Sequence, residues 1–137
     1  MNQKHKILMI DDDPFLLDMY GIKFEERDFE VITLPDYSGD FVQKVIDINP
    51  DIISLDVIVP GMDGFEAIKL LKNDDRTKNI PCVFLTNLGQ QDDINKGMAL
   101  GASGYIVMAS AAPVVVIDKF IDILKSTNKE LGIPTKD

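Results

Sequence analysis

Three carboxylates in this chain stand at the ends of apolar runs. Asp11 and Asp12 follow the run 7–10, and Asp56 follows the largely apolar run 52–55. If both runs are parallel strands of one sheet, the carboxylates gather at its carboxyl edge, where open α/β sheets bind their ligands. Anions held so close repel one another and raise each other's pKa values, so the arrangement makes most sense around a divalent cation. We therefore predict a metal site at these three acids.

Asp13, the next residue, has a simpler role at the start of a helix. It precedes Pro14, and an aspartate followed by proline at the first helical position is typical of an N-cap. A cap needs only one acceptor oxygen, so the two acids before Asp13 exceed what the helix requires. We assign Asp13 to capping and keep Asp11 and Asp12 for the metal.

Asp56 leads into the loop 57–64, in which Pro60, Gly61 and Gly64 turn the chain sharply into a helix. Taken alone, an aspartate at a strand end is also consistent with an ordinary surface acid. Beside two further carboxylates and a divalent cation, it has the character of a nucleophile that attacks phosphorus, because the cation neutralises the approaching anions. The sequence thus predicts phosphoryl chemistry at Asp56.

Strand-like and helix-like segments alternate along the whole chain. Apolar runs typical of buried strands cover 6–11, 30–33, 51–56, 80–85 and 104–108. Helical spacing covers 14–27, 38–48, 64–73, 91–100 and 113–126. Five β-then-α units of this kind predict a parallel sheet with helices on both faces and right-handed crossovers. Asp63 followed by Glu66 also resembles a capping box at the start of the third helix.

The size and charge of the chain restrict its function. Its 137 residues fit one domain, which we assign to 1–128, followed by a short polar tail at 129–137. The formal charge of −9 argues against binding to nucleic acids or anionic membranes. Residues 1–6 lead into only four apolar residues, too few for a signal peptide or a membrane span, so we expect a cytoplasmic protein.

The single cysteine and the single histidine give no sign of a zinc site or of a nucleophile and base pair. Cys82 lies in an apolar run, which is typical of a small buried hydrophobe. His5 lies in the polar leader.

Taken together, these motifs resemble the receiver domains of bacterial two-component response regulators over residues 5–126. The motifs that carry the resemblance are Asp11 with Asp12, Asp56 with the loop 60–64, Leu85 with Thr86, and Gly101 and Ala102 with Tyr105. The resemblance implies an α/β fold of the flavodoxin-like, doubly wound type. Its five-stranded parallel sheet would have the strand order 2-1-3-4-5.

The resemblance also implies roles for the acidic residues. Asp56 matches the phosphoacceptor, Asp12 a direct Mg²⁺ ligand, and Asp11 a ligand that acts largely through water. The backbone carbonyl of Ile58 would complete the protein's share of the ligands. Mg²⁺ is therefore the expected cofactor.

Three further positions match residues that take part in the family's conformational response to phosphorylation. Thr86 matches the hydroxyl that reorients toward the phosphoryl group, and Tyr105 matches the aromatic ring that moves inward with it. The family carries a lysine at the end of the fifth strand, where this sequence has Met108. A thioether has no charge and donates no hydrogen bond, so Met108 puts the expected coupling of phosphate to the rearranged surface in question.

The resemblance implies a signalling module and not an enzyme in the usual sense. It would accept a phosphoryl group from a histidine kinase or a phosphotransfer protein onto Asp56 and, as a stand-alone domain, act through an output protein. The alternative is an interaction module of the same fold whose phosphoswitch is uncoupled by Met108. A phosphohydrolase would need a general acid two residues after the nucleophile, where the chain has Ile58.

The segment 108–117 is unusual because alanine and valine fill places where other receivers have polar or acidic residues. This departure marks either a specialised partner surface or an engineered change. Helical spacing puts Val115 in the polar arc of the last helix and Val114 at its edge. With Ala111 and Ala112 before them, they predict an apolar patch that contacts a partner or forms a homodimer through this helix.

Overall fold

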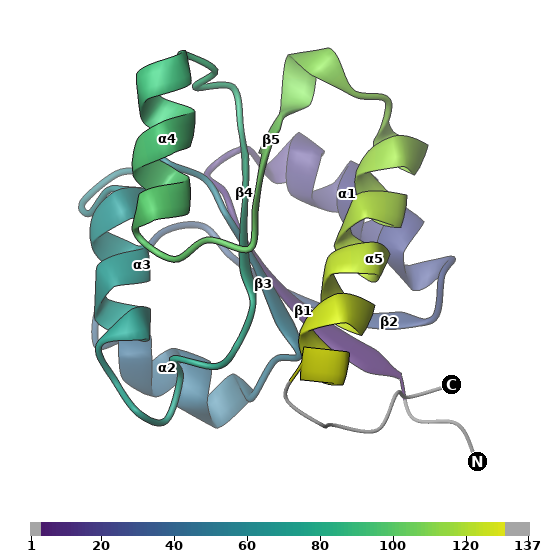
Figure 1. The fold of residues 1–137 in the computed structure, drawn as a ribbon. Coiled ribbons are helices and arrows are strands. Elements are labelled where there is room, and N and C mark those ends of the chain that lie inside the picture. The colour runs from purple at the N-terminus through teal and green to yellow at the C-terminus, as the bar shows by residue number, and fades with distance from the viewer. Residues whose placement is uncertain (1–3, 131–137) are drawn as a thin grey trace.

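The computed structural model describes residues 4–130, with side chains described as far as residue 128. A central parallel sheet carries helices on both of its faces (Figure 1). The strands are β1 (His5–Ile10), β2 (Phe29–Leu34), β3 (Ile52–Leu55), β4 (Cys82–Thr86) and β5 (Gly104–Val107). The helices are α1 (Pro14–Glu25), α2 (Phe41–Ile48), α3 (Gly64–Lys72), α4 (Gln91–Ala99), the 3₁₀ turn η1 (Met108–Ser110) and α5 (Pro113–Glu130).

The strand order is β2-β1-β3-β4-β5, and every neighbouring pair is parallel. The predicted fold class and strand order are therefore confirmed. The register places Ile10 of β1 beside Leu55 of β3, so these two central strands end at the same level. Residues that directly follow them must meet at the carboxyl edge of the sheet.

Two hydrophobic clusters hold the helices to the sheet. Helices α1 and α5 cover one face, and α2, α3 and α4 cover the other (Figure 1). Strand side chains alternate between the faces of the sheet. Ile7 and Met9 therefore pack in the cluster beneath α1 and α5, whereas Leu8 and Ile10 pack in the cluster on the opposite face. Cys82 is fully buried in β4, as its apolar surroundings predicted.

Aspartate side chains start three of the helices. The Asp13 carboxylate accepts hydrogen bonds from the N–H groups of Phe15 and Leu16, which confirms its role as the cap of α1. Asp63 accepts from the N–H of Glu66 at 2.8 Å, which confirms Asp63 as the cap of α3, while the Glu66 carboxylate pairs with Lys69. Helix α2 begins at Phe41, later than the predicted 38, because Asp40 is its cap and the preceding Gly39 has a left-handed backbone.

The ends of the last two elements also differ from prediction. β5 ends at Val107, and Met108 begins η1 where the chain tightens into a 3₁₀ turn. Helix α5 continues past the predicted end at 126 as far as Glu130 because Asn128 still lies on its buried side. The predicted tail at 129–137 lies outside the described residues from 131 onward. Among residues 4–130, no helix combines the length and apolar character needed to cross a bilayer.

Candidate functional site

The three predicted acids come together at the carboxyl edge of the sheet. Asp11 and Asp12 follow β1, Asp56 follows β3, and one carboxylate oxygen of each lies within 4.8 Å of the others. Asp11 is buried, Asp56 is half-buried and Asp12 is exposed, so the cluster opens to solvent on one side. Oxygens on opposite sides of a bound Mg²⁺ are about 4 Å apart, and carboxylates are the ligands that such hard cations prefer. The donor set therefore fits a divalent cation.

The buried Asp11 carboxyl holds its proton unusually tightly. Burial raises its pKa from 3.8 to about 7, although the N–H of Asp13 donates to its Oδ1 at 2.9 Å and opposes the shift. The nearby Asp56 carboxylate raises the pKa further. In the absence of a cation, the Asp11 carboxyl therefore retains its proton up to about neutral pH.

Several donors converge on the Asp56 carboxylate. Burial raises its pKa, while hydrogen bonds from the Thr86 hydroxyl and from the N–H groups of Ile58 and Val57 act in the opposite direction. The Asp11 carboxyl also donates to it. Thr86 thus reaches Asp56 from the neighbouring strand β4.

A cavity of about 290 Å³ lies directly against Asp56. Its lining residues are Asp56, Ile58, Thr86, Asn87 and Leu88. They come from the carboxyl end of β4 and from the loops after β3 and β4, which are neighbouring strands. A small anionic group placed here would contact both the Asp56 carboxylate and the Thr86 hydroxyl.

Tyr105 is joined to Thr86 through the backbone of Leu88. The Tyr105 hydroxyl donates to the Leu88 carbonyl, and the Leu88 N–H donates to Thr86 Oγ1 at 3.3 Å. Burial raises the pKa of Tyr105 to about 12, so the hydroxyl stays a donor. Gly97 of α4 makes room for the ring, because a Cβ there would lie 2.9 Å from Tyr105 Cδ2.

Met108 is not among the residues that line the cavity beside Asp56. It is half-buried and packs against the hydrophobic cluster beneath α1 and α5. Its side chain is therefore used as core packing at the point where the fifth strand ends.

Tyr37 is a site residue that the sequence did not reveal. Its hydroxyl donates to the backbone carbonyl of Asp56 at 2.6 Å, from the loop between β2 and α2. The only sequence signal is an aromatic residue inside the otherwise polar turn 35–40. Such a residue is equally consistent with simple core packing.

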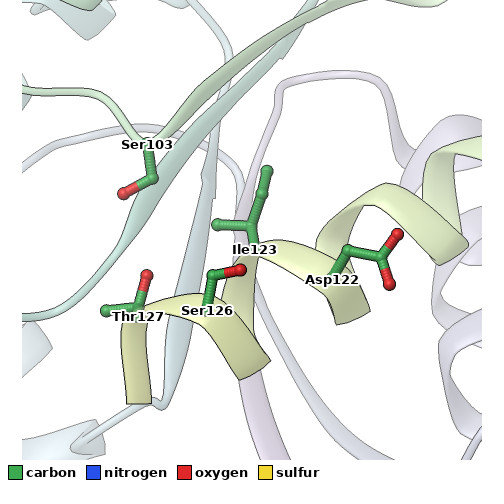
Figure 2. Close-up of a pocket in the computed structure, with 5 residues that line it drawn as sticks. All are labelled: Ser103, Asp122, Ile123, Ser126 and Thr127. Carbon is green, nitrogen blue, oxygen red and sulfur yellow. The ribbon is translucent and has the colours of Figure 1, made fainter. Parts of the chain in front are cut away.

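A second cavity lies at the opposite edge of the sheet. It has a volume of about 390 Å³ and is lined by Ser103, Asp122, Ile123, Ser126 and Thr127. Figure 2 shows hydroxyl groups of three of these residues around it and the Asp122 carboxylate pointing away from Ser103. Ser103 precedes β5, so this cavity is separated from the acidic cluster by the length of the sheet. None of the five lining residues carries a cationic group that would bind phosphate.

A doubly wound parallel sheet with an acidic cluster at its carboxyl edge defines an α/β domain whose candidate site lies where such sheets usually place their ligands. Residues 7–113 match the family described as the response regulator receiver domain. The chain belongs to this family, whose members are signalling domains of two-component systems.

Relatives of known sequence and structure agree with this assignment. The chain is 37% identical to the DNA-binding dual master transcriptional regulator RpaA of Synechocystis sp., over 74% of this chain and 42% of that protein. Its fold matches the chemotaxis response regulator CheY4 of Vibrio cholerae with a TM-score of 0.79, at 26% identity, covering 88% of this chain and 99% of that one. It also matches the BeF₃-activated receiver domain of Klebsiella pneumoniae RstA with a TM-score of 0.77, at 28% identity and covering 88% and 98% of the two chains.

The chain spans less than half the length of the first curated relatives that it matches. The similarity therefore concerns the receiver domain and not the remaining parts of those proteins. DNA binding is a property of RpaA as named, and the acidic charge of this chain argued against it here.

Proposed function

We propose that this chain is a phosphorylation-controlled signalling module in which Asp56 accepts a phosphoryl group from the phosphohistidine of a histidine kinase or a phosphotransfer protein. The observation that carries the proposal is the meeting of Asp56 with Asp11, Asp12 and the Thr86 hydroxyl beside one small cavity. In the reaction, an Asp56 carboxylate oxygen forms a bond to phosphorus, the bond between phosphorus and the histidine nitrogen breaks, and the imidazole leaves.

The residues around Asp56 have different roles in this phosphoryl transfer. Asp11, Asp12, Asp56 and the Ile58 carbonyl would hold Mg²⁺, which supplies neutralisation of the charge on the incoming phosphoryl oxygens. The N–H groups of Val57 and Ile58 orient the carboxylate. Thr86 already donates to Asp56 and would donate to a phosphoryl oxygen in the same cavity.

Asp56→Asn is expected to abolish phosphoryl acceptance. An amide keeps the shape of the carboxylate but lacks the nucleophilic oxygen anion. The parent and the variant would be incubated with a small phosphodonor and Mg²⁺ and compared by intact-mass spectrometry. The parent should gain the mass of one phosphoryl group and the variant should gain none. Equal labelling of both proteins would reject Asp56 as the acceptor.

The alternative function is a receiver-fold interaction module whose partner binding is independent of phosphate. The packing of Met108 into the core beneath α1 and α5 favours it, because no ammonium extends from this position to the phosphoryl group. The family's lysine at the matching position would make a charge-assisted hydrogen bond to the phosphoryl oxygens. With methionine in place of lysine, Asp56 could accept a phosphoryl group without the conformational change that normally follows.

Met108→Lys is expected to strengthen the response of Thr86 and Tyr105 to phosphorylation. A charge-assisted hydrogen bond contributes roughly 1.5 to 3 kcal/mol, which is comparable to the difference between two conformations of a protein switch. Amide chemical shifts at both residues would be recorded with Mg²⁺ and a beryllofluoride mimic of the phosphoryl group. Shifts of the same size in the parent and in Met108→Lys would show that Met108 does not limit the coupling.

The partners and the location of the chain remain predictions. An output protein would receive the signal, and the end of α5 offers a contact surface, since Val114 is 60% and Val115 is 42% exposed. Ala111 packs partly against the core, which makes the patch smaller than the sequence indicated. A homodimer through α5 and a cytoplasmic location stay predictions from the sequence.

A further inference from the structure

The Asp56 backbone is held by a side chain from a distant loop. Tyr37 lies between β2 and α2, is only 2% exposed, and donates its hydroxyl to the Asp56 carbonyl at 2.6 Å. Its ring meets the Phe41 ring edge-on at a centroid distance of 5.0 Å, which fixes the direction of the hydroxyl. The donor is therefore both buried and oriented.

The same carbonyl is confined from a second side by Gly64. A Cβ added to Gly64 would overlap the Asp56 carbonyl oxygen and lie 2.9 Å from Val57 Cα. The Gly64 N–H donates to the Val57 carbonyl at 2.8 Å. The peptide groups of Asp56 and Val57 are thus held by Tyr37 and by the start of α3.

We propose that Tyr37 is a positioning residue for the phosphoacceptor, acting through the hydrogen bond from its hydroxyl to the Asp56 carbonyl. This inference rests on the proposed function of Asp56. The Asp56 peptide sets the direction of its own carboxylate and of the following Val57 and Ile58, whose N–H groups donate to that carboxylate. A shift in this backbone would move the nucleophile, two of its donors and the proposed carbonyl ligand together.

The Tyr37 hydroxyl, and not its ring, is the group that holds the Asp56 backbone. The ring fills the hydrophobic cluster beneath α2 and α3, and a phenylalanine would fill the same space. Burial and the nearby Asp56 keep the pKa of Tyr37 well above its ordinary value, so the hydroxyl remains a donor throughout the neutral range. Tyr37→Phe therefore removes the positioning contact while keeping the packing.

The test compares Tyr37→Phe with Tyr20→Phe in the full chain. Tyr20 is also a buried tyrosine, 3% exposed, but it lies on α1 against the opposite face of the sheet. The rate of phosphorylation by acetyl phosphate would be measured at saturating Mg²⁺, together with the thermal midpoint and the ¹³C carbonyl shift of Asp56. We expect Tyr37→Phe to lower the rate roughly tenfold or more, since loss of such an outer partner typically weakens a site by 10- to 100-fold.

Tyr20→Phe should leave both the rate and the carbonyl shift as in the parent. A matched pair covers the case in which Tyr37→Phe does not fold: 4-aminophenylalanine at residue 37 keeps a donor, and 4-methylphenylalanine has similar size without one. Only the first should retain the parent rate. A parent-like phosphorylation rate in a protein that lacks a donor at residue 37 would overturn the positioning role alone. Equal losses of phosphorylation rate in Tyr20→Phe and Tyr37→Phe would do the same. A parent that is never phosphorylated on Asp56 would overturn the proposed function and this inference with it.

Discussion

Gly64→Ala is expected to destabilise the domain by about 3 kcal/mol and to lower the rate of Asp56 phosphorylation by roughly two orders of magnitude. The reason is steric. An alanine Cβ would overlap the Asp56 carbonyl oxygen and lie 2.9 Å from Val57 Cα. Both neighbours are backbone atoms, so no rotamer change relieves the overlap. The loop after β3 must move, and it carries Asp56, the proposed phosphoacceptor.

Gly21→Ala is the matched control. Gly21 is also buried, but a Cβ there would lie 3.7 Å from Val31 Cγ1, which is ordinary van der Waals contact. Since Gly21 lies inside α1, alanine should leave stability unchanged or raise it by up to about 1 kcal/mol. Urea denaturation would measure both variants, and phosphodonor labelling would measure the site. A Gly64→Ala protein as stable and as reactive as the parent would contradict the tight packing of this loop.

Much of the fold could be predicted from the sequence because the three central strands, β1, β3 and β4, are buried on both faces over most of their length. Continuous apolar runs followed by helical spacing leave few arrangements other than a parallel, doubly wound sheet. The acidic cluster follows from the same reasoning, since Asp11, Asp12 and Asp56 all lie within two residues of the end of a central strand. The sheet register then brings them together, because Ile10 and Leu55 are paired.

Contacts between distant backbone and side-chain groups could not be predicted in this way. Tyr37 is 19 residues from Asp56, and its partner is a carbonyl oxygen that every residue possesses. The bridge from Thr86 to Tyr105 likewise passes through the backbone of Leu88. Residue types and spacing carry no signal for such contacts, whereas they do carry one for charged clusters.

The exact ends of helices and strands could not be predicted from the sequence either, because they depend on the local backbone conformation. Met108 was expected to finish the fifth strand, but the chain turns into η1 directly after Val107. Alternating hydrophobicity does not distinguish the last residue of a strand from the first of a tight turn. The difference matters because residue 108 was matched, from the sequence, to the position of the family's lysine.

Asp11→Asn is expected to stabilise the metal-free protein at pH 8 while weakening its binding of Mg²⁺. The folded protein raises the pKa of Asp11 from 3.8 to about 7, mainly through burial, so folding favours the neutral form. The stability contributed by that neutral form is fully present below pH 4 and is lost as the pH rises through about 7. The loss in the parent is on the order of 4 kcal/mol at pH 8.

Asparagine is neutral at every pH and keeps an oxygen that accepts from the Asp13 N–H. The unfolding free energies of the variant and the parent should therefore agree near pH 4 and diverge as the pH increases. Chemical denaturation in the presence of a chelator, at several pH values, would measure the difference. Adding Mg²⁺ should reverse the order, because an ion that binds only the folded parent stabilises it in proportion to the logarithm of its concentration.

Asp12→Asn separates the cost of burying a charge from the loss of a ligand. Asp12 belongs to the same acidic cluster but is exposed, so its replacement relieves no burial. The Asp12 variant should lose the stabilisation by Mg²⁺ without gaining stability in the chelator at pH 8. If Asp11→Asn and Asp12→Asn instead gave the same increase in metal-free stability, mutual repulsion within the cluster, and not burial of Asp11, would be the dominant effect.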